Sequence, residues 1–375
     1  MMFSKKKKYV LSSLVLLFLL FFSFINTAKA DDWYEEKGYY TIYIKDTSEL
    51  LFMIAHGISI GDEYLSGDNK LYEIVEVKDS GYIGYAEFKE DIKLPEISSI
   101  EEEGLALMLQ QQERKIGLFH THSDESYEPT DGKSSIDGKG GIYKVGDALK
   151  KGLEENNINV IHKQDLHLPH DAGAYRRSRP TKEDILKQNP SAIFDVHRDG
   201  IPADQYSFKL NGKDATKVRL VVGKKNQNIE KNKNLAFKLK AVSDEMYPGL
   251  LKDIFMGKGN YNQDLAPNTI LLEIGTHKNS REAAQNTAKT FADVIKVAVF
   301  GGGEKIEGQK DEPAKTVKNT KPAATDNRGT GRGIFMVLGI AAVLTIGFLF
   351  ISTGGKELRS KFGETFSSFI GRKRK

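Results

Sequence analysis

The sequence predicts an α/β fold, with a mainly parallel, mixed sheet flanked by helices, a small N-terminal α+β domain and a C-terminal transmembrane helix. The first of three observations favours the α/β class, and the other two concern its core and its site. From Lys115 onward, short apolar runs alternate with segments of helical pattern, which is typical of parallel strands connected by helices. The chain has 375 residues, of which 39% are hydrophobic, enough to bury a sizeable core. Polar clusters directly after several apolar runs indicate where such a sheet would carry its site.

The expected elements of the α/β domain, residues 113–300, follow from its apolar runs and their flanks. The spacing of Thr181 and Asp184 resembles a capping box and predicts a short helix after Pro180. Longer helices are expected over about residues 141–156, 230–247 and 280–299. Apolar runs of strand length predict strands at residues 116–119, 158–161, 191–196, 217–223 and 268–275.

Residues 31–112 are expected to form the small N-terminal α+β domain. Alternating apolar and polar residues indicate half-exposed strands at 39–44 and 70–77, and residues 81–88 could pair with the second of these. Residues 47–58 have the pattern of a short helix. His56 is the one histidine in this apolar segment, and we interpret it as structural. The residues of this domain do not indicate a function.

Both ends of the chain predict a membrane association. Residues 1–30 combine four lysines, an apolar run and an Ala-Lys-Ala site, the pattern of a cleaved signal peptide or of an uncleaved signal anchor. Residues 333–353 are uncharged and long enough to span a bilayer, and the basic tail at 354–375 places the C-terminus in the cytoplasm. Residues 301–332, rich in Gly, Lys, Pro and Thr, are typical of a flexible linker. We therefore expect a cell-membrane protein whose N-terminus and α/β domain lie outside the cytoplasm.

Charge and cysteine content exclude several classes of site. The formal net charge of +4 is small for a chain of this length and does not indicate a nucleic-acid partner. The chain contains no cysteine, which excludes disulfides, thiolate zinc sites and cysteine nucleophiles. Any metal must therefore be bound by His, Asp or Glu.

Three polar signatures lie at the ends of predicted strands. HTHSDE contains His120, His122 and Glu125, DVHRDG contains His197, and Glu273 interrupts the apolar run of LLEIG. Six of the eight histidines lie between residues 120 and 197, so these side chains are strongly clustered. In an α/β sheet of this kind, sites form where the strands end at their carboxyl edge.

The residue types at these positions predict a catalytic zinc site. His122 and Glu125 are spaced to reach one ion, and His197 completes a set of two histidines and one carboxylate that leaves a position open for water. Glu273 would be the general base, because burying a carboxylate in an apolar strand without a purpose is costly. His120 could replace His122 as ligand, support the ligands from behind, or act as a catalytic group on the substrate, since strand alternation points both histidines to the same side. Each residue alone could be structural, but their joint position at strand ends favours a metal.

The segment between the first two signatures is rich in histidine and arginine. His162, His167 and His170 are expected in a loop rather than in a second metal site, because Pro169 interrupts a helical spacing. Arg177 and Arg198 are candidate binders of substrate carboxylates or of a developing oxyanion, since guanidinium groups bind carboxylates bidentately. The alternative for the arginines is a solvated basic loop.

In chain order, HTHSDESY, AYRRSR, DVHRDG and LLEIG resemble the stage II sporulation protein P family of peptidoglycan hydrolases over about residues 113–300. The resemblance implies a fold similar to that of zinc N-acetylmuramoyl-L-alanine amidases. It implies cleavage of the amide between N-acetylmuramic acid and the L-alanine of the stem peptide, with peptide cross-links as a further substrate. It also implies a role in forespore engulfment together with stage II sporulation proteins D and M.

Two features depart from the family pattern. The usual amidases have a ligand glutamate at the start of the helix after the first strand, but residues 141–152 contain none, so Glu125 is assigned instead. The family is normally held by an N-terminal segment, whereas this chain has the apolar segment at 333–353, which would suit a relative that hydrolyses the wall outside sporulation. Two alternatives stay open: a zinc carboxypeptidase or endopeptidase acting on wall peptides, and a non-catalytic scaffold that binds the cell wall.

Overall fold

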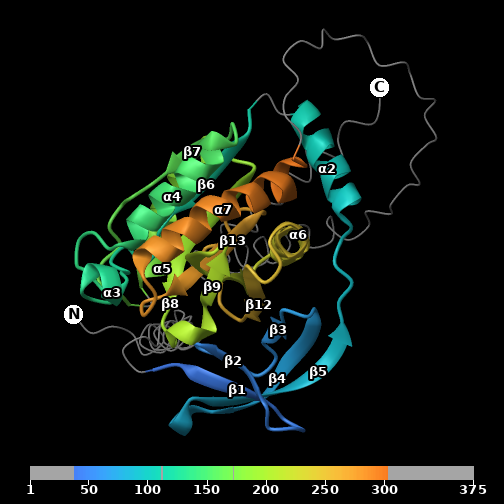
Figure 1. Ribbon diagram of the computed structural model, residues 1–375, viewed down its shortest axis with the longest axis vertical. Helices are drawn as coiled ribbons and strands as arrows, with labels where there is room; N and C mark the ends of the chain where they lie inside the picture. The colour runs from blue at the N-terminus through green and yellow to red at the C-terminus, as the bar shows by residue number, and fades with distance from the viewer. Residues whose placement is uncertain (1–37, 111–112, 172, 303–375) are drawn as a thin grey trace, which may run out of the picture. The chain divides into compact units, whose positions relative to one another are not determined.

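The computed structural model describes residues 38–110, 113–171 and 173–302, and most of its strands form one mixed sheet (Figure 1). The strand order in this sheet is β2-β1-β5-β4-β3-β12-β11-β13-β8-β6-β7. Its members are β1 (Tyr40–Ile44), β2 (Leu50–Ile54), β3 (Glu63–Leu65), β4 (Lys70–Lys78), β5 (Ile83–Asp91), β6 (Lys115–Phe119), β7 (Asn159–His162), β8 (Ala192–Asp199), β11 (Val218–Gly223), β12 (Leu251–Gly257) and β13 (Thr269–Thr276).

The predicted α/β class is confirmed by the pairing of the strands that follow residue 113. β7, β6, β8 and β13 form a continuous parallel ladder, and β11 is parallel to β12. β11 and β13 are antiparallel to each other, so the sheet is mixed, as predicted. The helices are α2 (Ile97–Gln110), α3 (Glu128–Asp131), α4 (Ile142–Glu155), α5 (Ala174–Leu186), α6 (Ile229–Met246) and α7 (Arg281–Phe300).

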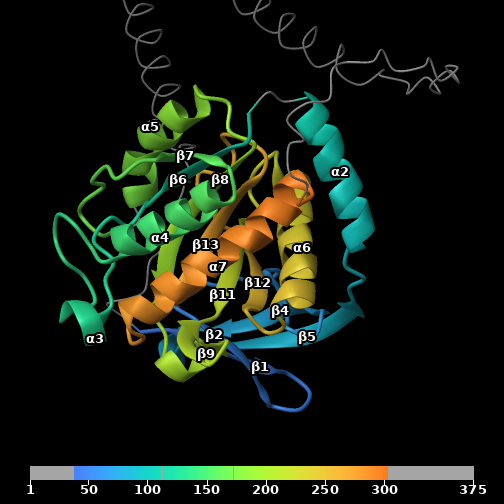
Figure 2. The same ribbon diagram turned by 45° about the horizontal axis from the view of Figure 1, so that its top comes forward.

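Helices α4, α6 and α7 cover one face of the parallel strands (Figure 2). α7 begins where the Ser280 side chain accepts a hydrogen bond from Ala283 N and ends at Gly301, whose φ of 70° favours glycine. Its apolar stripe, with Phe291 and Ile295, is buried against strand residues such as Leu272. Each large apolar side chain buried in this way stabilises the fold by about 1.5–3 kcal/mol.

The N-terminal strands belong to the same sheet, because β3 pairs antiparallel with β12. Phe52 of β2 and Tyr64 of β3 stack with ring centroids 3.9 Å apart, and both pack in one cluster with Val221 and Phe255. The sheet therefore continues across the predicted boundary at residues 112/113. β4 and β5 form the antiparallel pair that the sequence predicts.

Two local predictions are wrong. Residues 47–58 contain strand β2 instead of a helix, and within it Phe52 and Ile54 are buried. Short apolar runs do not distinguish a strand from a helix. The helix near Pro180 begins at Ala174, so Thr181 lies inside it and does not cap its N-terminus. Thr181 Oγ1 lies 2.9 Å from His167 Nε2. β12 and the separate hairpin of β9 (Ser207–Leu210) and β10 (Lys213–Thr216) were not predicted.

Several predicted segments lie outside the described residues: the signal sequence at 1–30, nearly all of the linker at 301–332, the apolar segment at 333–353 and the basic tail. Within residues 38–110, 113–171 and 173–302, no helix combines the length and the apolarity needed to cross a membrane.

Candidate functional site

Three buried side chains from two segments bring possible metal donors together. His122 and Glu125 lie in the turn after β6, and His197 lies on β8. Their donor atoms all lie within 4.8 Å of one another. Glu125 Oε1 is 3.3 Å from His122 Nδ1 and 3.2 Å from His197 Nδ1, and all three side chains are fully buried. Two imidazoles and one carboxylate are the donors of many catalytic zinc sites.

Neighbouring groups orient the members of this donor set. Asp195, also on β8, places Oδ1 at 2.9 Å from His197 Nε2. Thr121 binds the same carboxylate through its backbone N at 2.8 Å and its Oγ1 at 2.6 Å. Arg198 N donates to Glu125 Oε2 at 3.0 Å. A carboxylate on the far nitrogen of a ligand histidine is the usual arrangement around protein-bound metals, and it fixes which nitrogen faces the ion.

The pKa shifts of the donor set are those of a buried acid between imidazoles. Burial raises the pKa of Glu125 to about 7, His197 opposes this rise, and the nearby charge of Glu273 adds to it. Burial lowers the pKa of His122 well below its usual range. The pKa of His197 is well above its usual range because Asp195 and Glu125 outweigh the opposing effect of burial. A divalent cation fits here, since it would stabilise the ionised Glu125 and take the place of protons on the donor atoms.

Glu273 lies beside this set, on the strand next to His197. The two residues are register partners in the parallel ladder of β13 and β8, so their side chains point to the same face of the sheet. Glu273 is fully buried, and its Oε1 lies 2.7 Å from His56 Nε2. The structure therefore brings together four of the predicted site residues: His122, Glu125, His197 and Glu273.

His120 is turned away from the donor set. β6 ends at Phe119, so the strand alternation that would align His120 with His122 does not continue. His120 Nδ1 lies 2.9 Å from Val196 O and its Nε2 lies 2.8 Å from His162 Nε2. Its position is that of a buried residue supporting the turn, and the predicted catalytic role stays a prediction.

The two predicted arginines bind loops around the site. Arg177 Nε donates to His167 O at 2.7 Å, and its guanidinium also contacts Asp171. Arg198 is fully buried, donates from Nε to Ser126 O at 3.2 Å, and has its pKa lowered to about 10 by burial. Substrate binding by either residue stays a prediction.

The structure adds two histidines that the sequence analysis did not assign to the site. His170 stacks on His122 with ring centroids 4.2 Å apart, and its Nδ1 lies 3.0 Å from Asp124 Oδ1. His56 reaches Glu273 from the N-terminal strands. The clustering of histidines between residues 120 and 197 could have indicated His170, but no local pattern distinguishes His56.

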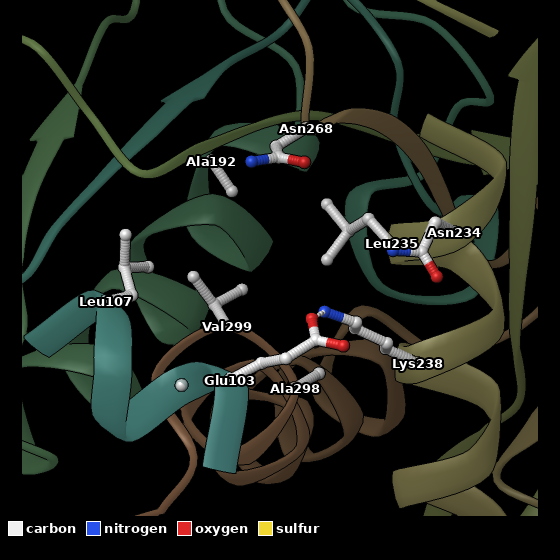
Figure 3. Close-up of a pocket in the computed structure, with 10 residues that line it drawn as sticks. Glu103, Leu107, Ala192, Asn234, Leu235, Lys238, Asn268, Ala298 and Val299 are labelled. Atoms are coloured by element: carbon white, nitrogen blue, oxygen red, sulfur yellow. Dashed lines mark hydrogen bonds and ion pairs between the residues drawn. The ribbon is translucent and has the colours of Figure 1, made fainter. Parts of the chain in front are cut away.

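A cavity of about 200 Å³ lies away from this centre, between α2, α6 and α7 (Figure 3). Ala192 and Asn268 line it, and they lie at the amino ends of β8 and β13, the strands whose later residues carry His197 and Glu273. Its charged lining residues, Glu103 and Lys238, pair with each other. This cavity is therefore separate from the donor set.

A family model described as stage II sporulation protein P matches residues 65–296. Stage II sporulation protein P of Bacillus subtilis (strain 168) is 32% identical over 219 residues, which is 53% of this chain and 54% of that protein. The match thus spans about half the length of this curated relative.

Solved structures with some similarity include two amidases. The CwlD amidase from Clostridioides difficile, in complex with the GerS lipoprotein, is 15% identical with a TM-score of 0.33, covering 50% of this chain and 95% of that chain. The N-acetylmuramyl-L-alanine amidase Ami1 from Mycobacterium smegmatis is 15% identical with a TM-score of 0.33, covering 51% and 98%. TM-scores of this size support no conclusion about this chain.

Proposed function

The chain belongs to the stage II sporulation protein P family, and from that premise we propose that it is a zinc-dependent peptidoglycan hydrolase. The bond we propose it cleaves is the amide between N-acetylmuramic acid and the L-alanine of the stem peptide. The observation that carries the proposal is the meeting of His122, Glu125 and His197 beside the buried carboxylate of Glu273. A hydrolytic zinc site needs such a donor set together with a nearby acid or base.

Zinc is the metal that suits these donors. Imidazole nitrogens favour zinc over magnesium and calcium, which prefer oxygen donors throughout. Bound by His122, Glu125 and His197, zinc would act as a Lewis acid toward the amide carbonyl and the attacking water.

Glu273 supplies the proton transfers of the proposed reaction. Its Oε2 has no hydrogen-bond partner among the residues that the structure describes, so it can accept a proton from the attacking water. The same oxygen then returns the proton to the amine nitrogen as the C–N bond breaks. Addition of one water thus yields a carboxylate on the lactyl group of the sugar and a free amine on L-alanine.

A second cavity, of about 480 Å³, offers room for part of a large substrate. Phe208 and Pro129 line it together with Lys278 and Ser280, which directly follow β13, the strand that carries Glu273. We propose that a sugar or stem-peptide segment next to the cleaved bond lies here, because the cavity combines an aromatic ring with polar and charged groups.

The setting of the reaction is part of the proposal. A signal sequence at 1–30 and a membrane segment at 333–353 would hold the catalytic domain outside the cytoplasmic membrane, with the C-terminus inside. Such a tether would limit hydrolysis to nearby glycan. The family relationship supports a role in sporulation, with stage II sporulation proteins D and M as proposed partners.

Digestion of purified peptidoglycan by the full-length protein tests the function. An amidase releases intact stem peptides with a free L-alanine amine, which mass spectrometry identifies. Peptides that remain attached to the glycan but are shortened or unlinked would indicate a carboxypeptidase or endopeptidase instead. A protein that releases nothing and holds no stoichiometric zinc would be a scaffold, and the proposal would be wrong.

Two variants test the assignment of Glu273. Glu273→Gln should lower turnover by about 10²–10⁴-fold, because it removes the proton acceptor, and should still bind zinc. Glu245→Gln is the matched control, since Glu245 is exposed at the end of α6 and should have no effect. Normal turnover by Glu273→Gln would exclude Glu273 as the general base.

A further inference from the structure

The end of β2 crosses the part of the sheet that carries Glu273, and two hydrogen bonds hold it there. Arg219 Nη1, on β11, donates to Met53 O at 2.9 Å. Ala55 N donates to Asp199 Oδ1, on β8, at 3.3 Å. β11 and β8 are the two neighbours of β13, so this segment lies across the strand of Glu273. The residue that follows is His56.

His56 and Glu273 form a buried pair. Nε2 of His56 lies 2.7 Å from Oε1 of Glu273, and the two side chains are 4% and 0% exposed. If Glu273 acts as a general base, its carboxylate can only accept, and the imidazole N–H would donate this hydrogen bond. One oxygen of Glu273 is thus held by His56, while Oε2 has no partner among the described residues. The two carboxylate oxygens therefore have different surroundings.

The core of the protein sets the position of His56. Tyr261 packs edge-on against its ring, with centroids 5.8 Å apart at an interplanar angle of 80°. Arg219, which binds Met53, also forms fully buried ion pairs with Asp199 at 2.9 Å and Asp253 at 2.5 Å. Such a buried charge network is costly to break, so it keeps the end of β2 in one position.

We propose that His56 is a positioning residue for the hydrolytic reaction. Its Nε2–H binds Oε1 of Glu273 and so orients Oε2 for the proton transfers. This inference rests on the proposed function, in which Glu273 is the general base. Through His56, the strands β1–β5 would contribute to the active site. His56 precedes residue 65, where the match to the family model begins.

Steady-state kinetics of amide cleavage by the full-length protein test the role of the hydrogen bond. His56→Leu removes the donor but keeps much of the volume, and should lower kcat about 10- to 100-fold, as when the hydrogen-bond partners of metal ligands are lost. KM and zinc affinity should stay near their original values, because His56 is outside the donor set. His56→Gln provides an N–H donor again and should recover most of the lost kcat.

Tyr64→Phe is the control for a merely structural effect. Tyr64 lies on β3, and its hydroxyl donates to Asp253 at 3.1 Å, so the variant weakens the same docking network without touching Glu273. It should lower the Tm while leaving kcat unchanged. Unchanged kcat in His56→Leu, or equal losses in His56→Leu and His56→Gln, would overturn the inference.

Thermal unfolding of the metal-free protein gives a readout independent of turnover. His56→Leu leaves the buried carboxylate of Glu273 without its donor, so it should lower the Tm more in the wild-type background than in the Glu273→Gln background. Equal Tm losses in both backgrounds would overturn the inference even if the protein hydrolyses nothing. One outcome is that the wild type is active while Glu273→Gln is inactive. In that case, a His56→Leu variant with wild-type kcat would refute only the role of His56 and would leave the proposed function intact.

Discussion

Asp195→Asn should weaken zinc binding, because Asp195 determines which nitrogen of His197 faces the donor set. Asp195 Oδ1 lies 2.9 Å from His197 Nε2, and the same carboxylate accepts both hydrogen bonds of Thr121. A proton held on Nε2 leaves Nδ1, 3.2 Å from Glu125 Oε1, as the metal donor. Asparagine has nearly the same volume, but one of its two terminal groups is an NH₂ that cannot accept these hydrogen bonds.

The expected loss is about 10- to 100-fold in zinc affinity, or about 1.4–2.8 kcal/mol, as for other carboxylates that orient ligand histidines. Competition between the full-length protein and a chromogenic zinc chelator measures it. Asp147→Asn is the matched control, because Asp147 lies 3.2 Å from His162, a histidine outside the donor set. Unaltered zinc affinity in Asp195→Asn, or an equal loss in Asp147→Asn, would refute the reasoning.

Three further predictions concern stability. Burial lowers the pKa of Lys182 to about 7, so the unfolded chain binds more protons than the folded one between about pH 7 and 10.5, and stability should rise with pH across that window. In the wild type the free energy of unfolding should rise by on the order of 2 kcal/mol between pH 7 and 9, and denaturant unfolding should show that Lys182→Met removes this rise. The same pH profile in the wild type and in Lys182→Met would contradict the lowered pKa of Lys182. Zinc at about 100 times its Kd should raise the free energy of unfolding by about 2.7 kcal/mol, and a chelator should reverse the gain in Tm; no change in Tm would argue against a metal bound to the folded state. Gly152→Ala should destabilise the fold by about 1–3 kcal/mol, because its Cβ would lie 2.5 Å from Lys289 O and 2.8 Å from Ala292 Cβ where α4 meets α7; an unchanged Tm would show that the helices separate freely.

Much of the donor set could be predicted because it is encoded at strand ends. His122 and Glu125 follow the apolar run of β6, His197 lies in the polar second half of β8, and Glu273 interrupts the apolar run of β13. A polar group in such a run is conspicuous, because burial without a partner is costly. Parallel pairing of β8 with β13 then places His197 and Glu273 side by side.

Other parts of the site depend on contacts that no local pattern shows. His56 is 217 residues from Glu273 in the chain, and it sits in a run that we predicted to be helical. β12 was missed because Asp253 interrupts its apolar residues, and the matching charge is Arg219 on the neighbouring strand. His120 was expected beside His122, but the strand ends one residue before it.

By itself, the sequence determined the alternation of strands and helices after residue 113, the bounds of α4, α6 and α7 to within about two residues, and the residue types available to a metal. These properties follow from local periodicity and from the cost of burying polar groups. Only the tertiary structure decided that the N-terminal strands extend the same sheet through β3 and β12, and that His56 holds Glu273. Both features depend on hydrogen bonds between segments that are far apart in the chain. These bonds form because a buried donor on one segment needs an acceptor, and the other segment provides it.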